Sequence, residues 1–380
     1  MIPVANRLNT VKEYYFSIKL REVRNLIQEG KPIINLGIGS PDLEPPTEVL
    51  KALSKANIHG YQNYQGIPEL RQAIAKFYRT YYDVKLKPEN EILPLMGSKE
   101  GILHISMAYL NNGDEVLVPN PGYPTYTSVT NLVQAKPIFY DLTEANDWQP
   151  DFEALEKRDL SKVKIMWVNY PHMPTGSNAS DGLFEKLIAF AKKHKILIIN
   201  DYPYSFILNE KPKSILSVKG AKDVAIELNS LSKTFNMAGW RVGMVVGSKK
   251  YLDNILKVKS NMDSGMYYGI QKGAIAALNL SNKWFDQINN IYKKRRKIIW
   301  DICDKINCTY DINSTGLFVW AKIPKGKTSN EICDELLYNH DVFITPGNIF
   351  GSNGENYIRF SLCITEDKIQ EVLTRVSKNN

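Results

Sequence analysis

Short apolar runs alternate with amphipathic stretches from about residue 92 to residue 246, and this alternation constrains the fold more than any other feature. The apolar runs are rich in Ile, Val and Leu: EILPLMG, DEVLVPN, KPIFYDL, VKIMWVNY, KILIIND, AIELNSLSK and WRVGMVVG. Stretches with helical periodicity, such as GILHISMAYL and DGLFEKLIAFAKKHK, lie between them. Strands that are apolar along their length are typical of parallel sheets with helices on both faces. We therefore predict an α/β fold, with a mostly parallel sheet sandwiched by helices.

The C-terminal part of the chain does not continue this alternation of apolar runs and helical stretches. Helical stretches at 248–264 and 283–307 are followed by the apolar runs TGLFVWAKI, DVFITPG and NYIRFSLCI, with further helices near 328–339 and at the end. This order is typical of a smaller α+β domain. A chain of 380 residues is long enough for two or three domains. We predict three segments, which are an N-terminal arm (1–45) that joins the small domain, a large domain (46–280) and the small domain (281–380).

Charge and composition exclude several classes of protein. With 43% hydrophobic and 23% charged residues, the chain is typical of globular proteins and not of disordered ones. The net charge of +8 is spread along the chain, whereas a dedicated nucleic-acid-binding protein concentrates its charge. The densest basic run, residues 293–297, has helical spacing and is predicted to be a solvated helix face.

The four cysteines include no Cys-x-x-Cys pair, so the sequence predicts neither a metal site nor a disulfide framework. No apolar stretch approaches the ~20 residues of a membrane span. The N-terminal sequence also lacks the charged-then-apolar layout of a signal peptide. We expect a cytoplasmic protein with reduced thiols that binds neither nucleic acid nor membrane.

The segment NSLSKTFNMAGWRVGMVVG, residues 229–247, carries the clearest chemical signal. Lys233 is flanked by Ser230 and Ser232, and Arg241 follows eight residues later. Hydroxyl groups and a guanidinium beside one lysine can bind a phosphate, while the lysine amine forms an imine with a carbonyl cofactor. The segment resembles the lysine motif of class I and II aminotransferases, Ser-x-Ser-Lys-Thr-Phe-x-Met-x-Gly-x-Arg-x-Gly, at every fixed position. The resemblance implies fold type I with pyridoxal 5'-phosphate as cofactor.

Further segments of this family follow in order between residues 14 and 363, and each implies a role by resemblance. LGIGSPD places Gly39 in the loop that closes over the substrate carboxylate. YQNYQGIPELRQAI maps Tyr61 to the tyrosine that reaches the phosphate in the neighbouring subunit, which implies a homodimer. NPGYPTY maps Tyr123 to the aromatic residue that stacks on the pyridine ring.

Gly97 and Ser98 stand between a predicted strand and a predicted helix. Backbone N–H groups and the helix dipole at such a turn attract a phosphate. The family uses this turn to bind the cofactor phosphate, and we add Lys99 to the cofactor-binding residues by the same resemblance.

Two charged residues complete the predicted site. Asp201 stands just past the strand KILII, where open α/β sheets bind ligands. By resemblance, Asp201 pairs with the protonated ring nitrogen, Tyr204 donates a hydrogen bond to the phenolic oxygen, and Lys233 moves the proton. Arg359, in NYIRFSLCI, maps to the arginine that holds the substrate carboxylate. Tyr15 is a further expected substrate contact because of its position in the arm.

The chain departs from the family at one position of this site. The family writes Asn-Pro-Thr-Gly where this chain has Met173, Pro174, Thr175 and Gly176. A thioether donates no hydrogen bond. Because the phenolic oxygen loses a donor, we expect the cofactor imine to have a raised pKa. His172 is a candidate donor to the same oxygen.

The resemblance implies an aminotransferase that moves an amino group between an L-amino acid and a 2-oxo acid, with glutamate and 2-oxoglutarate as one pair. Two alternatives stay open. The same lysine and carboxylate would serve a C–S β-lyase, and the Pro-His pair before Met173 also occurs in such enzymes of this family. A non-catalytic protein that binds the cofactor is the second alternative, which Met173 suggests and the intact Lys233 opposes.

The amino-acid substrate also stays open. YYFSIKLREV and LGIGSPD resemble the branch of the family that contains LL-diaminopimelate aminotransferases. However, Ser264, in SGMYYGIQ, stands where that branch is expected to have an asparagine.

Overall fold

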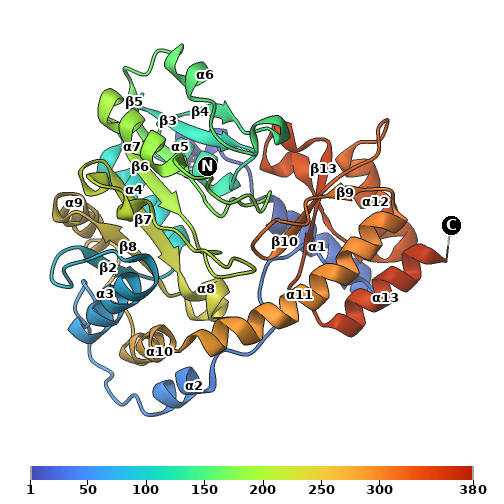
Figure 1. The fold of residues 1–380 in the computed structure, drawn as a ribbon, viewed down its shortest axis with the longest axis horizontal. Helices are drawn as coiled ribbons and strands as arrows, with labels where there is room; N and C mark the ends of the chain where they lie inside the picture. The colour runs from blue at the N-terminus through green and yellow to red at the C-terminus, as the bar shows by residue number, and fades with distance from the viewer. Residues whose placement is uncertain (1, 379–380) are drawn as a thin grey trace.

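A seven-stranded sheet forms the centre of the larger part of the molecule (Figure 1). The structure, a computed structural model, describes residues 2–378. The strands run in the spatial order β2-β8-β7-β6-β5-β3-β4, and β8 is antiparallel to both of its neighbours while the other pairs are parallel. They are β2 (Ile92–Leu95), β3 (Glu115–Asn120), β4 (Lys136–Asp141), β5 (Val163–Val168), β6 (Leu197–Asp201), β7 (Ala225–Ser230) and β8 (Gly243–Gly247). The predicted α/β fold with a mostly parallel sheet is confirmed.

Helices cover both faces of this sheet, which explains why its strands are apolar throughout. Neighbouring strand residues point to opposite faces, so Met166 and Trp167 of β5 belong to two different hydrophobic cores. One core is shared with α3 (Pro68–Tyr82), α7 (Leu183–His194) and α10 (Tyr268–Leu278). Helix α2 (Thr47–Ser54) packs against α10. The other core is shared with α4 (Ser98–Tyr109), α5 (Pro124–Leu132) and α9 (Lys249–Lys259). The short helices α6 (Phe152–Glu156) and α8 (Leu231–Thr234) follow β4 and β7.

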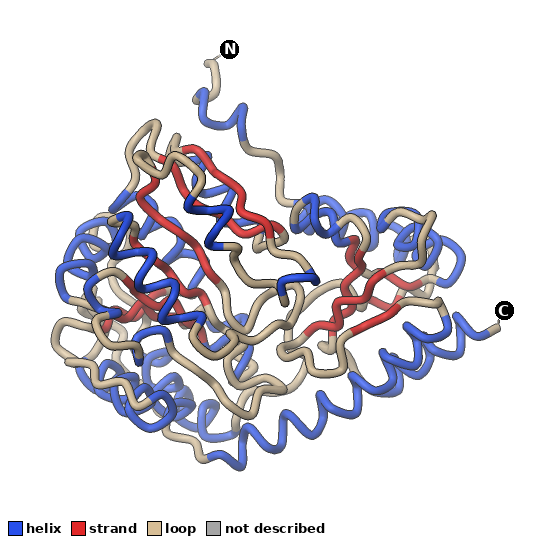
Figure 2. Tube along the Cα trace, turned by 45° about the horizontal axis from the view of Figure 1, so that its top comes forward, coloured by secondary structure: helices blue, strands red, loops and turns tan. Residues whose placement is uncertain are grey.

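A smaller four-stranded sheet, of order β12-β13-β10-β9, forms the core of the C-terminal part. Figure 2 shows the two sheets on either side of a band of loops. The strands are β9 (Thr309–Tyr310), β10 (Phe318–Lys322), β12 (Thr345–Pro346) and β13 (Tyr357–Ser361), and the helices are α11 (Asn282–Lys305), α12 (Ser329–His340) and α13 (Glu366–Ser377).

The N-terminal segment lies against this C-terminal part. Its helix α1 (Tyr15–Gln28) is followed by β1 (Ile34–Asn35), which pairs in parallel with β11 (Val342–Phe343). This pairing agrees with an arm that joins the small domain, while the domain limits at 45 and 280 stay predictions. Within residues 2–378, no helix is long and apolar enough to cross a membrane.

The prediction for the basic run at 293–297 is wrong in one respect. Lys293, Lys294 and Lys297 are exposed on α11, but Arg295 is buried. Its guanidinium donates two hydrogen bonds to the carboxylate of Asp42, at 2.6 and 2.9 Å. In a run of basic residues on a helix, every third or fourth side chain lies on the packed face. Here that side chain is Arg295, which forms an ion pair with Asp42.

Candidate active site

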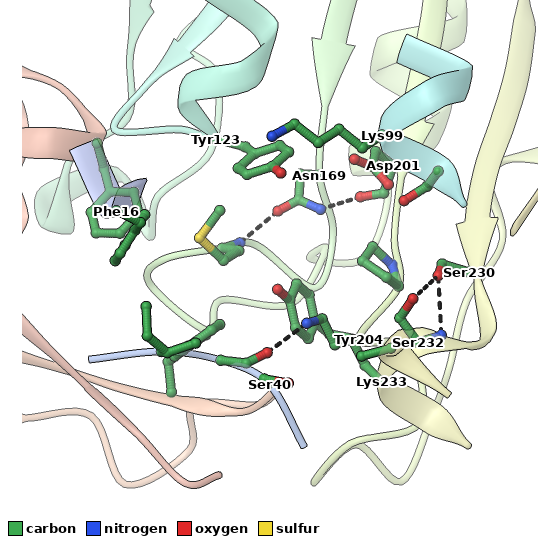
Figure 3. Close-up of a pocket in the computed structure, with 18 of the residues that line it drawn as sticks. Phe16, Ser40, Lys99, Tyr123, Asn169, Asp201, Tyr204, Ser230, Ser232 and Lys233 are labelled. Carbon is green, nitrogen blue, oxygen red and sulfur yellow. Dashed lines mark hydrogen bonds between the residues drawn. The ribbon is translucent and has the colours of Figure 1, made fainter. Parts of the chain in front are cut away.

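A cavity of about 400 Å³ lies where the two parts of the molecule meet (Figure 3). Its floor is formed at the carboxyl ends of parallel strands, where Asn169, Asp201 and Ser230 end or follow β5, β6 and β7. Ser98 follows β2. Because the strand ends share one edge of the sheet, residues far apart in the sequence meet there. Arg359 of β13 closes the cavity from the opposite side.

Lys233 projects into the cavity from α8, one turn after β7. Its Nζ donates a hydrogen bond of 2.5 Å to the carbonyl oxygen of Gly39, which joins the floor to the N-terminal segment (Figure 3). Burial lowers the pKa of the Lys233 amine, and the nearby guanidinium groups of Arg359 and Arg241 lower it further. A lowered pKa increases the fraction of neutral amine, the form that attacks a carbonyl and accepts a proton.

Asp201 ends β6 and is buried on the floor. The hydroxyl of Tyr126 donates a hydrogen bond of 2.9 Å to its Oδ2. Its Oδ1 has no hydrogen-bond partner among the residues that the structure describes. Burial raises the pKa of the Asp201 carboxyl to about 7. A buried carboxylate oxygen without a partner is costly for the protein alone, and a cationic N–H group of a ligand would satisfy it.

Five residues form an anion-binding group, which we call the anion seat, beside this floor. Ser98 begins α4, so its backbone N–H and the helix dipole point at the cavity. The hydroxyl of Ser230 lies 2.8 Å from that of Ser232. Gly97 has a left-handed backbone with φ of 90°, and a side chain there would collide with the guanidinium of Arg241. Glycine at position 97 therefore allows Arg241 to approach the helix N-terminus closely.

Lys99 lines the same cavity but points away from this seat. Figure 3 shows its side chain extending along Tyr123, away from Ser230 and Ser232. Its Nζ lies 4.5 Å from the centroid of the Tyr14 ring. This geometry does not support the expectation that the Lys99 side chain binds the cofactor phosphate.

Arg359 is buried, with a 4% exposed side chain, and makes no ion pair with an acid of the described chain. Its Nη2 donates to the carbonyl oxygen of Gly37 at 2.9 Å, its Nη1 lies 3.4 Å from the sulfur of Met173, and its Nε has no partner. The rings of Phe318 and Phe350 lie 3.8 and 4.6 Å from its Cζ. Burial lowers the pKa of this guanidinium to about 10. A cation that is buried without a counter-charge is suited to hold an anionic ligand.

The segment around Met173 does not replace the missing amide. Met173 lines the cavity, whereas His172 lies outside the lining and its Nδ1 is 2.8 Å from Oγ1 of Thr175. Burial lowers the pKa of His172 to about 3, so it is neutral at ordinary pH. Asn169 does line the cavity, but its Oδ1 accepts from the Met173 backbone at 2.6 Å and its Nδ2 donates to the backbone carbonyl of Asp201. Both ends of that amide are therefore already used.

The structure brings Tyr14, and not Tyr15, to the cavity. Tyr14 precedes α1 and has an extended backbone, whereas Tyr15 is the first residue of the helix. Successive side chains around this helix start point in different directions, and Tyr15 turns toward Cys333 and Asp334. Tyr15 was expected to contact the substrate, but it does not line the cavity, whereas its neighbour Tyr14 does.

Of the other residues predicted for the site, three line the cavity and one does not. Gly39, Tyr123 and Tyr204 line the cavity. Tyr61 does not, and its side chain is 92% exposed. Sequence reasoning missed several lining residues because a single apolar or polar residue outside a motif carries no signal of its own. They are Phe16, Leu20, Ile38, Ser40, Tyr126, Asn169, Pro203, Ala238, Phe318 and Phe350.

The residues of the cavity fit pyridoxal phosphate. The unpartnered oxygen of Asp201 suits a protonated ring nitrogen, and the seat at Ser98 suits a phosphate. Lys233 lies in the same cavity, with a lowered pKa that suits a covalent link to an aldehyde. No metal is needed for any of these contacts.

Comparisons with known proteins agree with this site. The family model described as aminotransferase class I and II matches residues 31–376. The chain is 40% identical to the LL-diaminopimelate aminotransferase of Maridesulfovibrio salexigens, over 99% of this chain and 98% of that one. It is 38% identical to the enzyme of the same name from Aquifex aeolicus, over 99% of both.

Among solved structures, apo-BacF from Bacillus subtilis is 37% identical, with a TM-score of 0.95 over 100% of this chain and 99% of that one. An aminotransferase from Staphylococcus aureus is 31% identical, with a TM-score of 0.90 over 99% of this chain and 98% of that one. Because relatives named as enzymes match over their full length, the non-catalytic alternative is set aside. The chain belongs to the class I and II aminotransferases, a family of pyridoxal-phosphate enzymes with fold type I.

Proposed function

We propose that this enzyme transfers an amino group between an L-amino acid and a 2-oxo acid, with glutamate and 2-oxoglutarate as one partner pair. The observation that carries the proposal is Arg359, a buried guanidinium without an acidic partner in the described chain, which shares one cavity with Lys233 and Asp201. A planar guanidinium holds a carboxylate through two parallel hydrogen bonds. An α-carboxylate held there is fixed relative to the floor of the cavity.

Each charged group of the cavity then has one role. Bound pyridoxal phosphate supplies an electron sink for the electrons of the Cα–H bond. Asp201 would keep the ring nitrogen protonated by accepting a hydrogen bond from its N–H group, and the Tyr204 hydroxyl would donate a hydrogen bond to the phenolic oxygen. Arg359 orients the Cα–H bond, and the Nζ of Lys233 takes the proton from Cα. The anion seat of Gly97, Ser98, Ser230, Ser232 and Arg241 holds the phosphate.

Two further roles belong to this proposal. Lys99 has no acidic partner among the lining residues, so its amine is available to the distal carboxylate of glutamate or 2-oxoglutarate. Tyr61, with its 92% exposed side chain, reaches the phosphate in the neighbouring subunit of a homodimer. A Tyr61→Phe variant that binds the cofactor as tightly as the parent enzyme would contradict this second role.

The visible absorption of the purified holoenzyme tests the proposal. We expect the absorption band to disappear with an L-amino acid and to return with 2-oxoglutarate, because the two half-reactions interconvert the aldehyde and amine forms of the cofactor. Release of pyruvate and ammonia from cystathionine, without recovery of the band by an oxo acid, would instead favour a C–S β-lyase.

A further inference from the structure

The region around Arg359 is an apolar wall, which we define as Phe16, Leu20, Ile38, Phe318 and Phe350. These residues come from α1, from the loop after β1, from β10 and from a 3-10 turn that precedes β13. The rings of Phe318, Phe350 and Phe16 lie 3.8, 4.6 and 5.6 Å from the Arg359 Cζ. The side chain of a substrate whose α-carboxylate is held by Arg359 therefore lies next to this wall.

The charges that line the cavity are strongly unbalanced. Lys99, Lys233, Arg241 and Arg359 are cations, and Asp201 is the one acid that lines it among residues 2–378. Asp201 lies on the floor and is committed to the ring nitrogen in the proposed function. A second carboxylate on a substrate can pair with Lys99, but a second ammonium group has no acid to pair with in the lining that this subunit provides, apart from Asp201.

The two acids nearest in the sequence to the wall residues of α1 are already paired. Glu13 and Glu22 flank the wall residues of α1, and they form ion pairs with Arg21 at 2.7 Å and with Lys19 at 3.0 Å. If α1 moved toward the cavity, each glutamate would move together with its basic partner. It would therefore not act as a free carboxylate for a substrate ammonium group.

From the apolar wall and the missing acid we infer that the amino-group donor is an L-amino acid with an uncharged apolar or aromatic side chain, and not LL-diaminopimelate. This inference rests on the proposed function. LL-diaminopimelate carries a second carboxylate and a second ammonium group at its far end. The carboxylate can pair with Lys99, but the ammonium group would face apolar side chains and cations of this subunit. A phenylalanine, leucine or methionine side chain would bury apolar surface against the wall instead.

The experiment is a substrate panel on the holoenzyme. The rate at which each amino acid removes the visible band is measured for L-phenylalanine, L-leucine, L-methionine and LL-diaminopimelate. We expect kcat/KM for the best neutral substrate to exceed that for LL-diaminopimelate by about 100-fold or more. An equal or higher value for LL-diaminopimelate would overturn the inference and leave the aminotransferase function intact. A band that no amino acid removes would overturn both.

A matched pair of variants sharpens the test. Leu20→Glu adds a carboxylate to the wall, and Leu20→Gln adds the same volume without the charge. We expect Leu20→Glu to raise the ratio of kcat/KM for LL-diaminopimelate over phenylalanine by about 10-fold, and Leu20→Gln to leave it nearly unchanged. Equal shifts in both variants would contradict the charge argument. Ile38→Glu, on a different segment, provides the same test if the Leu20 variants do not fold.

Discussion

Two buried arginines of this enzyme differ in their partners. Arg295, on α11, is 1% exposed and holds the carboxylate of Asp42 with two hydrogen bonds of 2.6 and 2.9 Å. Arg359, in the cavity, is 4% exposed, and within residues 2–378 its guanidinium hydrogen-bonds to a carbonyl oxygen and a thioether but to no acid. The first charge is satisfied by the fold, whereas the second is left for a ligand.

The buried acids show the same contrast. Asp263 lies outside the cavity and forms an ion pair of 2.8 Å with Lys259, whose side chain is fully buried. Asp201 lies inside the cavity, where its Oδ1 has no partner within the described part of the chain. Leaving a buried charge unsatisfied costs stability. In the proposed function, cofactor and substrate supply the missing charges at Asp201 and Arg359.

The largest effect is expected from Arg359→Met. Removal of the guanidinium takes away the bidentate hold on the α-carboxylate, so kcat/KM for every amino acid should fall by about 1000-fold, or about 4 kcal/mol. The melting temperature should stay equal or rise, because no acid loses its partner. Steady-state kinetics and thermal unfolding measure both quantities. A large loss of stability would show that Arg359 has a structural role.

Arg295→Met is the matched change in the paired region and should have the opposite profile. The free energy of unfolding should fall by about 3 kcal/mol, since Asp42 loses two charge-assisted hydrogen bonds and Glu366 and the carbonyl oxygen of Leu362 lose one each. The folded fraction should keep most of its kcat/KM. Chemical denaturation measures the loss, and the double variant with Asp42→Asn should recover part of it. No recovery would contradict the ion-pair explanation.

The pH dependence of the apoenzyme tests Asp201. Burial raises the pKa of its carboxyl from the ordinary value of 3.8 to about 7, so the folded chain keeps a proton that the unfolded chain has released. This contribution to stability is full below pH 3.8 and is lost as the pH rises through 7. Between pH 5 and 8 the loss should be about 2.5 kcal/mol.

Asp201→Asn should remove that share of the pH dependence. Burial also raises the pKa of Glu227 to about 7, and this residue is unchanged in the variant. Its part of the pH dependence of stability should therefore remain and serves as an internal control. Cofactor binding should also reduce the Asp201 share, because the ring nitrogen supplies the missing cation. An identical pH profile in the parent and the variant would contradict the assignment.

The smallest effect is expected from Met173→Asn. An amide at this position donates a hydrogen bond to the phenolic oxygen of the cofactor, which the thioether does not. The pKa of the visible band of the holoenzyme should therefore fall by about one unit, or about 1.4 kcal/mol. Met173→Leu, which also lacks a donor, should leave the band unshifted. A spectrophotometric pH titration distinguishes the two variants.

Much of the site was predictable because it sits on repeated sequence features. The apolar strands predicted the sheet, and Ser98 and Asp201 were expected at the ends of two of its strands, while Lys233 was assigned from the lysine motif. All three line the cavity. Arg359 was assigned from a segment match and also lies there.

The errors have a common physical cause. Tyr15 and Tyr14 are neighbours in the sequence, and the start of α1 decides which one turns to the cavity. Lys99 follows Ser98 directly, yet its side chain extends toward Tyr14. The sequence predicts the place of a residue along the fold to within about one helical turn. The direction of its side chain depends on the packing around it.

The sequence by itself determined the class of fold, the cofactor and the charged groups of the active site, because strand periodicity and a long lysine motif are local properties of the chain. The tertiary structure decided which buried charges are paired. Arg295 stands in a basic run and Arg359 between two apolar residues, and neither setting shows which guanidinium has an acid beside it. Asp42, 253 residues away in the sequence, and Glu366, 71 residues away, approach Arg295 alone. Pairing is a long-range property, and it separates the residue that stabilises the fold from the residue that is free to bind substrate.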